Sequence, residues 1–340
     1  MDELATAPKC LNLGLQGGGA HGAFTWGVLD RLLAEEQIKI EGICGTSAGA
    51  MNAAVLISGY CRDGRAGARA ALKRFWAQVG RHGSLIQPFS IPHWPDSWNM
   101  DWSPGWLWFD LLTRWFSPYQ LNPMNWHPLR AILEREIDFE ALREGAPIRL
   151  FVVATHVRTG KARVFQGRDL STDALLASAC LPQLFQAVEI DGEAYWDGGY
   201  MGNPALYPLI YNCESSDILV VQVNPLSRDE TPRTSTEIMN RVNEISFNST
   251  LMREMRAIAF VSRLVEEEGL DPTRYKRLHM HLIEAAPEMA RLGFASKLNA
   301  DPGFLEWLHR LGWQRADEWI STHLERVGVE STVDIAKSFL

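Results

Sequence analysis

The chain has 340 residues, of which 46% are apolar and 22% are charged, and its formal net charge is −8. This length allows one large hydrophobic core or two modest domains, and the composition is that of an ordinary globular protein. The negative net charge argues against a nucleic-acid partner, which would favour a basic face, and against long-range attraction to anionic membranes.

The five cysteines are widely separated, so neither a disulfide framework nor a zinc site is predicted. They are interpreted as small buried residues in a reducing compartment. The amino terminus lacks the apolar core of a secretory signal, and no apolar run approaches the ~20 residues that span a bilayer. We therefore expect a cytoplasmic protein, unless an uncleaved export route applies.

The first part of the chain alternates between strand and helix patterns. Residues 9–15 alternate like a strand, three glycines follow, and residues 20–36 have the periodicity of an amphipathic helix. A second strand is predicted over 38–44, followed by a glycine turn at 45–49 and an apolar helix over 50–58. This order is typical of a parallel α/β sheet.

Residues 81–126 interrupt this alternation with many prolines and tryptophans. Seven tryptophans fall within residues 94–126, and Trp106, Trp108 and Trp115 belong to an apolar cluster. One interpretation is a lid or interfacial segment, because tryptophan prefers the headgroup zone of bilayers. The other is a core-facing helix with its packing loops. Both interpretations stay open, and either one provides an apolar wall that suits an acyl chain.

Regular patterns return after this insert. The predicted elements are a helix over 127–137, strands over 148–155 and 161–166, a helix over 173–180, two short strands within 188–196, and a strand over 217–223. Later come a helix over 235–268 after a capping box at Thr234 and Glu237, a strand over 276–283, and a helix after Asp301-Pro302. We predict an α/β domain over residues 8–225, with 81–126 as insert or lid. A mostly helical extension over 226–340 packs on it.

Gly45-Thr46-Ser47-Ala48-Gly49 matches the pattern G-x-S-x-G of a nucleophile elbow. A serine wedged between a strand and a helix projects its oxygen clear of the sheet, and the flanking glycines leave room for so sharp a turn. The helix behind the turn offers N–H groups and a positive dipole end to an oxyanion. The pattern is weak alone, and a simple turn between strand and helix is the alternative.

Residues 17–22, Gly-Gly-Gly-Ala-His-Gly, form another glycine turn between a strand and a helix. One interpretation is an oxyanion hole, in which the N–H groups of Gly18 and Gly19 face a carbonyl oxygen above Ser47. The other is a dinucleotide fingerprint, with Glu41 near the place of a ribose-binding acid. We favour the hydrolase interpretation because it explains both glycine turns, whereas a nucleotide site leaves the serine elbow unexplained.

Asp197-Gly198-Gly199 places an acid at the end of a predicted strand, where it can point into the same crevice as Ser47. An ordinary triad would also need a histidine that accepts the serine proton. The histidines beyond Asp197 lack flanking glycines or a loop setting, so they are interpreted as surface or core residues, and a Ser-His-Asp triad stays an alternative. They are His279, His281, His309 and His323.

The three motifs, together with residues 177–182, resemble the patatin-like phospholipases over roughly residues 10–210. The resemblance implies a three-layer α/β/α sandwich with a mostly parallel central sheet, plus the helical C-terminal extension. It implies a Ser-Asp dyad in which Ser47 is the nucleophile and Asp197 is the base. His21 is a departure, because the family often has arginine there, and this removes the expectation that this side chain anchors a phosphate.

The resemblance also assigns the remaining site residues. Gly17, Gly18 and Gly19 would form the oxyanion hole, and no metal or cofactor is expected. The implied activity is that of a lipid acyl-hydrolase, of phospholipase A or lysophospholipase type, which cleaves carboxylic esters through an acyl-enzyme. The expected partner is a lipid substrate, with peripheral contact at a membrane as one interpretation and with no nucleic acid.

Three alternatives share these residues. An esterase or lipase of neutral lipids, storage lipids or polyesters would use the same groups. A nucleotide- or lipid-binding module would use the turn at 17–22 and leave Ser47 without a chemical role. An exported effector that acts on the membranes of another cell would have the same chemistry. The sequence indicates neither the head group, the acyl position and chain length, nor the oligomeric state.

Overall fold

The computed structural model describes residues 8–86, 98, 100–101, 104–267, 269, 271 and 275–340. The strands that form its eight-stranded sheet are β1 (Lys9–Leu15), β2 (Ile38–Thr46), β3 (Arg149–His156), β4 (Ala162–Phe165), β5 (Val188–Ile190), β6 (Glu193–Asp197), β7 (Asp217–Gln222) and β8 (His279–Glu284). The sheet order is β5-β6-β3-β2-β1-β7-β8, and β4 also pairs with β3. Strands β3, β2, β1, β7 and β8 run parallel, while β4, β5 and β6 join by antiparallel pairs.

The helices connect these strands and cover the sheet. The α-helices are α1 (Gly22–Ala34), α2 (Ala48–Ile86), α3 (Pro104–Trp115), α4 (Pro118–Leu121), α5 (Arg130–Glu136), α6 (Phe139–Arg143), α7 (Thr172–Ser178), α8 (Tyr207–Asn212), α9 (Ser235–Glu267), α10 (Ala286–Met289), α11 (Pro302–His323) and α12 (Ile335–Phe339). Short 3₁₀ helices are η1 (Gly19–His21), η2 (Gly167–Asp169), η3 (Gly198–Tyr200), η4 (Phe294–Leu298) and η5 (Leu324–Arg326).

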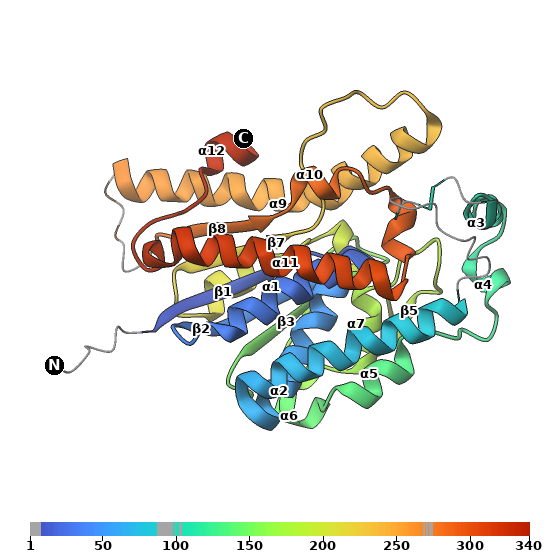
Figure 1. Ribbon diagram of the computed structural model, residues 1–340, viewed down its shortest axis with the longest axis horizontal. Coiled ribbons are helices and arrows are strands. Elements are labelled where there is room, and N and C mark those ends of the chain that lie inside the picture. The colour runs from blue at the N-terminus through green and yellow to red at the C-terminus, as the bar shows by residue number, and fades with distance from the viewer. Residues whose placement is uncertain are drawn as a thin grey trace.

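Two hydrophobic cores lie on opposite faces of the sheet. Successive side chains of a strand point to opposite faces, so Leu219 and Val221 of β7 pack in the core that holds α1, α2 and α11. Ile218 and Val220 of the same strand pack in the other core, with residues of α8, α9 and α12. Figure 1 shows α9 along one side of the sheet and α1 and α11 along the other. The predicted three-layer α/β/α sandwich with a mostly parallel sheet is confirmed.

The parallel strands bring the two glycine turns together. Leu15, at the end of β1, pairs with Gly45, near the end of β2. The segments that follow these strands therefore leave the same edge of the sheet, next to each other. In open α/β sheets this carboxyl edge is where ligands bind.

Residues beyond 225 take part in the sheet and in its cover. Strand β8 pairs in parallel with β7, and α11 crosses α1. The two helices approach closely, since a Cβ on Gly27 would lie 2.0 Å from the carbonyl oxygen of His309, and a Cβ on Gly312 would lie 2.0 Å from that of Phe24. Glycines on both helices therefore allow their backbones to touch.

Helix α2 is longer than predicted. It continues past residue 58 to Ile86 with non-helical dihedral angles at Asp63 and Gly64, so the start of the predicted insert is helical. The rest of the insert contains α3 and α4, which lie at one end of the molecule (Figure 1). Residues 87–97 fall outside the described part. None of the helices in the described ranges combines the length and apolar character needed to cross a membrane.

Candidate active site

The elbow serine lies in a sharp turn between β2 and α2. Ser47 has a φ of +53°, in the left-handed region, and is only 9% exposed. A Cβ on Gly45 would lie 2.6 Å from the nitrogen of Ala50, and a Cβ on Gly49 would lie 2.4 Å from the carbonyl oxygen of Leu15. The turn therefore needs glycine at both positions, because backbone segments approach too closely for a side chain.

Two hydroxyl groups hold the elbow in place. The N–H of Ser47 donates to Oγ of Ser178, at 2.9 Å, and Oγ1 of Thr46 donates to the carbonyl of Gly202, at 2.6 Å. Ser178 is the last residue of α7 and belongs to the segment 177–182. This segment thus supports the serine turn through a specific contact.

Asp197 ends β6 beside the elbow. It pairs with Ala154 of β3, the strand next to β2. The carboxyl group is buried and accepts the N–H of Gly199 at 2.7 Å, and the side chain of Ser47 lies close enough to lower its pKa. The structure therefore places the predicted base beside the predicted nucleophile.

Burial raises the pKa of Asp197 to about 7. The hydrogen bond from the N–H of Gly199, the nearby side chain of Ser47 and the charge of Lys297 each lower the pKa without offsetting the loss of solvation. A carboxylate with a pKa near 7 is a stronger base than an exposed aspartate, whose pKa is about 4.

The glycine turn packs directly on the serine. A Cβ on Gly17 would lie 2.8 Å from Cβ of Ser47. Gly19 has a φ of +58°, and a Cβ there would lie 2.3 Å from the carbonyl oxygen of Lys297. Glycine at both positions is thus required by the close contacts on the two sides of the turn.

The three glycines differ in their N–H groups. The N–H of Gly17 donates to Oδ1 of Asn203, at 2.7 Å. Among the described residues, the N–H groups of Gly18 and Gly19 have no acceptor. Gly18 and Gly19 therefore have the N–H groups that can bind an oxyanion, while Gly17 anchors the turn.

Buried amides hold this turn from behind. The side chain of Gln16 accepts the N–H of Asn224 at 3.0 Å, and donates to the carbonyl of Asn203 at 3.1 Å and to Oδ1 of Asn248 at 3.0 Å. The side chain of Asn224 in turn donates to the carbonyl of Gly17, at 2.9 Å. Sequence reasoning missed these residues; the only signal was a glutamine placed directly before the glycines.

His21 is buried and neutral. Loss of solvation, with a smaller effect from the charge of Lys297, lowers its pKa to about 3. Nε2 lies 2.8 Å from Oγ of Ser296, and that hydroxyl donates to the carbonyl of Gly293 at 2.6 Å. The hydroxyl must then accept from His21, so Nε2 carries the ring proton. Where the family often has arginine, this chain has an uncharged ring that ties η1 to η4.

The late histidines lie elsewhere. His281 and His279 face Asp217, at the amino end of β7, with Nε2 at 3.0 Å and Nδ1 at 3.4 Å from its carboxylate. His309 pairs with Asp30 of α1 at 3.1 Å. Within the described ranges, no histidine forms a hydrogen bond with the elbow serine. This geometry favours the Ser-Asp pair over a triad.

Glu41, the acid considered for a ribose, is also engaged elsewhere. Its carboxylate accepts the N–H of Glu214 at 2.6 Å and that of Ser215 at 2.8 Å. These residues precede β7, away from the carboxyl edge of the sheet. The geometry therefore does not place Glu41 beside the turn at 17–22.

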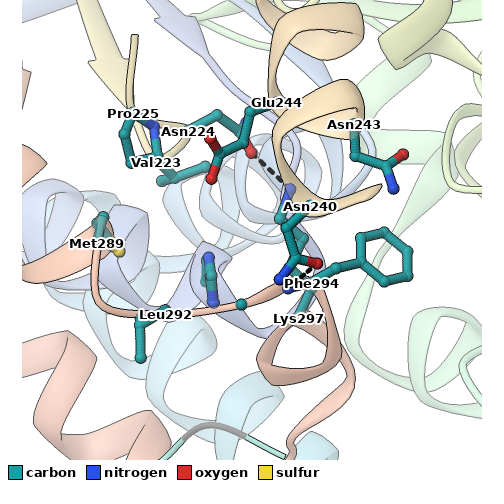
Figure 2. A pocket seen from close by; sticks show the side chains of 12 residues that line it. Val223, Asn224, Pro225, Asn240, Asn243, Glu244, Met289, Leu292, Phe294 and Lys297 are labelled. Carbon is teal, nitrogen blue, oxygen red and sulfur yellow. Dashed lines mark hydrogen bonds between the residues drawn. The ribbon is translucent and has the colours of Figure 1, made fainter. Parts of the chain in front are cut away.

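A small recess adjoins the glycine turn. Its lining includes His21, Asn224, Asn240, Phe294 and Lys297, which come from the turn, the end of β7, α9 and η4 (Figure 2). Its free space is about 10 Å³, which is room for about one water molecule. The part of the chain that the structure describes holds no group of three or more His, Cys, Asp or Glu side chains arranged for a metal ion.

The tryptophans of α3 are exposed. Trp108 is 66% exposed and Trp115 is 78% exposed, whereas the side chain of Trp106 lies outside the described part. Other large apolar side chains on α3, α4 and the following turn are also exposed. They are Leu111, Leu112, Phe116, Tyr119, Leu121, Met124 and Trp126.

Comparisons with known proteins identify the family of the chain. A family model described as patatin-like phospholipase matches residues 13–210, more than half of the chain. No curated protein sequence matches. Among solved structures, the chain is similar to VipD from Legionella pneumophila, with 15% identity and a TM-score of 0.42, over 93% of this chain and 68% of VipD. It is also similar to a chain of the heterodimeric ExoU–SpcU complex from the type III secretion system of Pseudomonas aeruginosa, with 17% identity and a TM-score of 0.38. That match covers 98% of this chain and 58% of the other, so this chain spans less than two thirds of its length.

Proposed function

The chain belongs to the patatin-like phospholipase family, and on that premise we propose that it hydrolyses carboxylic esters of lipids through an acyl-enzyme on Ser47. The observation that carries the proposal is the buried carboxyl of Asp197 beside the elbow serine, whose side chain lowers the pKa of that carboxyl. A serine is a weak nucleophile until an adjacent base accepts its proton. Asp197 is the group placed to do so.

The reaction has two halves. As Oγ of Ser47 attacks the ester carbonyl, Asp197 accepts the hydroxyl proton, and the N–H groups of Gly18 and Gly19 bind the oxyanion. Collapse of the tetrahedral intermediate breaks the ester C–O bond, and the protonated Asp197 gives its proton to the leaving alcohol. A water molecule, deprotonated by Asp197, then attacks the acyl-enzyme and releases the fatty acid together with the free serine.

The surroundings of the pair support this cycle. Helix α2 begins directly after Ser47, so its amino-terminal dipole favours negative charge at the reacting oxygens. The raised pKa of Asp197 makes the carboxylate a better proton acceptor while leaving it able to give the proton back near neutral pH. A base with an ordinary aspartate pKa would accept the proton far less readily.

A lipid substrate is supported by the exposed aromatic surface of α3. Trp108 and Trp115 are large side chains of the kind that partition into the membrane interface. We propose peripheral contact with a lipid surface through this helix and a phospholipid or lysophospholipid as substrate. Neutral lipids and polyesters would use the same Ser47 and Asp197, and the assay below distinguishes them by product.

The test is hydrolysis of defined substrates by matched serine variants. Wild-type protein is incubated with phosphatidylcholine vesicles, lysophosphatidylcholine, triacylglycerol emulsions and a short-chain aryl ester, and released fatty acid is quantified. Ser47→Ala should abolish release from every substrate, whereas Ser321→Ala, at an exposed position on α11, should leave it unchanged. Release that persists in Ser47→Ala would contradict the proposal.

A further inference from the structure

Lys297 lies against the glycine turn, although it is outside the residues that the family model matches. Lys297 belongs to η4, whereas the family model ends at residue 210. Its carbonyl oxygen lies where a side chain at Gly19 would otherwise stand. The backbone of η4 and the glycine turn are thus in direct contact.

The ammonium group of Lys297 is linked to both parts of the site. Nζ donates to Oδ1 of Asn224 at 2.7 Å, and the same amide donates to the carbonyl of Gly17 at 2.9 Å. Nζ also lies 5.5 Å from the centre of the Phe247 ring, in the range of a cation–π contact. The edge of that ring fills the space beside Gly199, whose N–H donates to Asp197.

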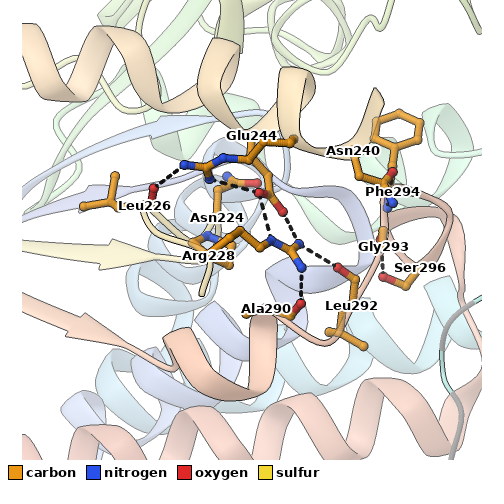
Figure 3. Close-up of polar contacts among 12 residues, drawn as sticks. Asn224, Leu226, Arg228, Asn240, Glu244, Ala290, Leu292, Gly293, Phe294 and Ser296 are labelled. Atoms are coloured by element: carbon orange, nitrogen blue, oxygen red, sulfur yellow. Dashed lines mark hydrogen bonds and ion pairs between the residues drawn. The ribbon is translucent and has the colours of Figure 1, made fainter. Parts of the chain in front are cut away.

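The charge of Lys297 is not neutralised by a direct ion pair. The nearby carboxylate of Glu244 already pairs with Arg228 and, at 3.2 Å, with Arg241. Figure 3 shows Arg228 between Glu244 and the carbonyls of Ala290 and Leu292. Among the described residues, no carboxylate lies within ion-pair distance of Lys297. The electric field of the Lys297 ammonium therefore reaches the Asp197 carboxyl.

The other groups around Asp197 are uncharged at neutral pH. The side chains that face it are Ser47 of the elbow, Cys180 after α7, Tyr200 of η3 and Lys297. Burial raises the pKa of Cys180 to about 12 and also raises that of Tyr200, so neither is ionised. The charges of Glu244, Asp197 and Arg228 act on Lys297 itself. Burial, with a smaller effect from the charge of Lys297, keeps the ring of His21 neutral.

We propose that Lys297 is a positioning residue for the Ser47–Asp197 pair. Its ammonium favours the carboxylate form of Asp197, and its link through Asn224 holds the glycine turn against the serine. This inference rests on the proposed function, because it assigns a role at the same site. With this role, the C-terminal region contributes a residue to the site.

The direct test is the titration of the Asp197 carboxyl, followed by ¹³C NMR with Asp197→Asn for assignment. Removing the positive charge raises the pKa of Asp197 further, so the titration midpoint should move to higher pH. In Lys297→Met and Lys297→Gln we expect a shift of roughly half a pH unit, less than the ~1–3 units produced by an opposite charge in contact. Gln retains a donor for Asn224, so it separates charge from hydrogen bonding. Lys73→Met, exposed on α2, is the matched control and should titrate like wild type.

The second readout is the pH dependence of kcat/KM on a soluble ester. The rising limb should shift to higher pH in both neutral variants and stay at the wild-type position in Lys297→Arg. A merely structural role would lower kcat/KM equally at all pH values without moving the limb. An Asp197 midpoint that is unchanged in both neutral variants, with thermal unfolding like that of wild type, would overturn the inference.

The wild-type protein provides a test that needs no substitution. Loss of solvation lowers the pKa of Lys297 to about 8. The Asp197 carboxyl signal should then show a second, smaller inflection near pH 8, as the neighbouring ammonium loses its proton. Its absence over the whole pH range in which the Lys297 ammonium titrates would overturn the inference even if the variants fail to fold. Because the NMR titration needs no turnover, a protein with this inflection but no hydrolysis would contradict only the proposed function.

Discussion

The protonation state of Asp197 changes within the neutral pH range, because burial raises its pKa to about 7. The carboxylate is the form that accepts the serine proton. For a soluble short-chain ester, kcat/KM should therefore rise about tenfold per pH unit below pH 7 and level off above it. A steady-state pH profile between pH 5 and 9 measures this. A profile that is already flat at pH 5 would mean that an ordinary carboxylate or a different base is at work.

The same burial has a cost in stability. The folded-state pKa of Asp197 exceeds the unfolded value near 3.9, so the folded protein loses stability as pH rises from about 4 to about 7. An asparagine does not ionise, so Asp197→Asn should be more stable than wild type at pH 8 by on the order of 2 kcal/mol. The difference should shrink at pH 5. Urea unfolding at the two pH values measures this difference in the free energy of unfolding. A stability advantage of the variant over wild type that is smaller at pH 8 than at pH 5 would contradict the prediction.

At the scale of single residues, the sequence predicts the residues of the candidate site, and the structure distinguishes what each of them contacts. The motifs single out Ser47 and Asp197, and in the fold the side chain of Ser47 lies close enough to lower the pKa of the buried Asp197 carboxyl. They could not reveal that the N–H of Gly17 is taken by Asn203, because that partner lies 186 residues away. Whether an N–H is free depends on a tertiary contact, which a local motif does not encode.

At the scale of elements, the alternation of apolar residues and the glycine and proline residues between segments predicted most strands well. The strand predicted over 9–15 is β1 with the same bounds, and the strands predicted within 188–196 form the β5–β6 hairpin. The capping box is also confirmed, since the N–H of Glu237 donates to Oγ1 of Thr234 at 3.3 Å. The extent of α2 was underestimated because the helix resumes after the non-helical Asp63 and Gly64, and its second half packs in the core.

Helix α3 offers a test of lipid contact. Replacing Trp108 and Trp115 with alanine removes two exposed aromatic side chains without opening a cavity. Hydrolysis of vesicles should fall several-fold, while hydrolysis of a soluble ester should change little, because interfacial tryptophans stabilise only the membrane-bound form. The matched control is Val329→Ala, which removes an exposed apolar side chain and should leave both activities unchanged. Equal loss on both substrates would indicate packing instead.

The histidine cluster at the amino end of β7 joins three elements. Asp217 accepts the N–H of Gly328 at 2.8 Å and faces His279 and His281 of β8. Its hydrogen bonds outweigh burial and lower its pKa, so it contributes stability above the unfolded pKa near 3.9 that is lost as pH falls through the folded value.

Removing that carboxylate should therefore weaken the fold without changing the site. Asp217→Ala should lower the free energy of unfolding at pH 7 by about 2 kcal/mol, since it leaves buried donors without an acceptor. Urea denaturation measures this, and kcat/KM of the folded variant should match wild type. A variant as stable as wild type, or one that folds normally but has lost activity, would show that the cluster has another role.

For the whole molecule, the C-terminal region supplies structure that the first 225 residues need. Without it, β7 loses its partner β8 and α1 loses the cover of α11. We predict that a fragment of residues 8–225 exposes these apolar faces and does not fold cooperatively, and that co-expression with 226–340 restores folding. Solubility, thermal unfolding and dye binding measure this. A fragment that unfolds cooperatively like the full chain would contradict the prediction.

The fold class could be predicted because it rests on local patterns, and the proposed Ser47–Asp197 pair rests on the same kind of pattern: alternating strands, glycine turns and an acid after a strand. The contribution of Lys297 could not. It lies 100 residues beyond Asp197 in a segment with no motif of its own, and only the packing of η4 on the glycine turn brings it to the site.

The most direct measurement of the central claim is covalent labelling by a fluorophosphonate, with the modified residue located by mass spectrometry, in wild type and in Asp197→Asn at pH 8. The account predicts rapid modification at Ser47 in wild type and a loss of about 100-fold or more in the labelling rate of the variant, since general-base assistance contributes typically 10²–10⁴-fold. Labelling at another residue, or equal rates in the two proteins in the presence of lipid vesicles, would contradict a Ser47 nucleophile activated by Asp197.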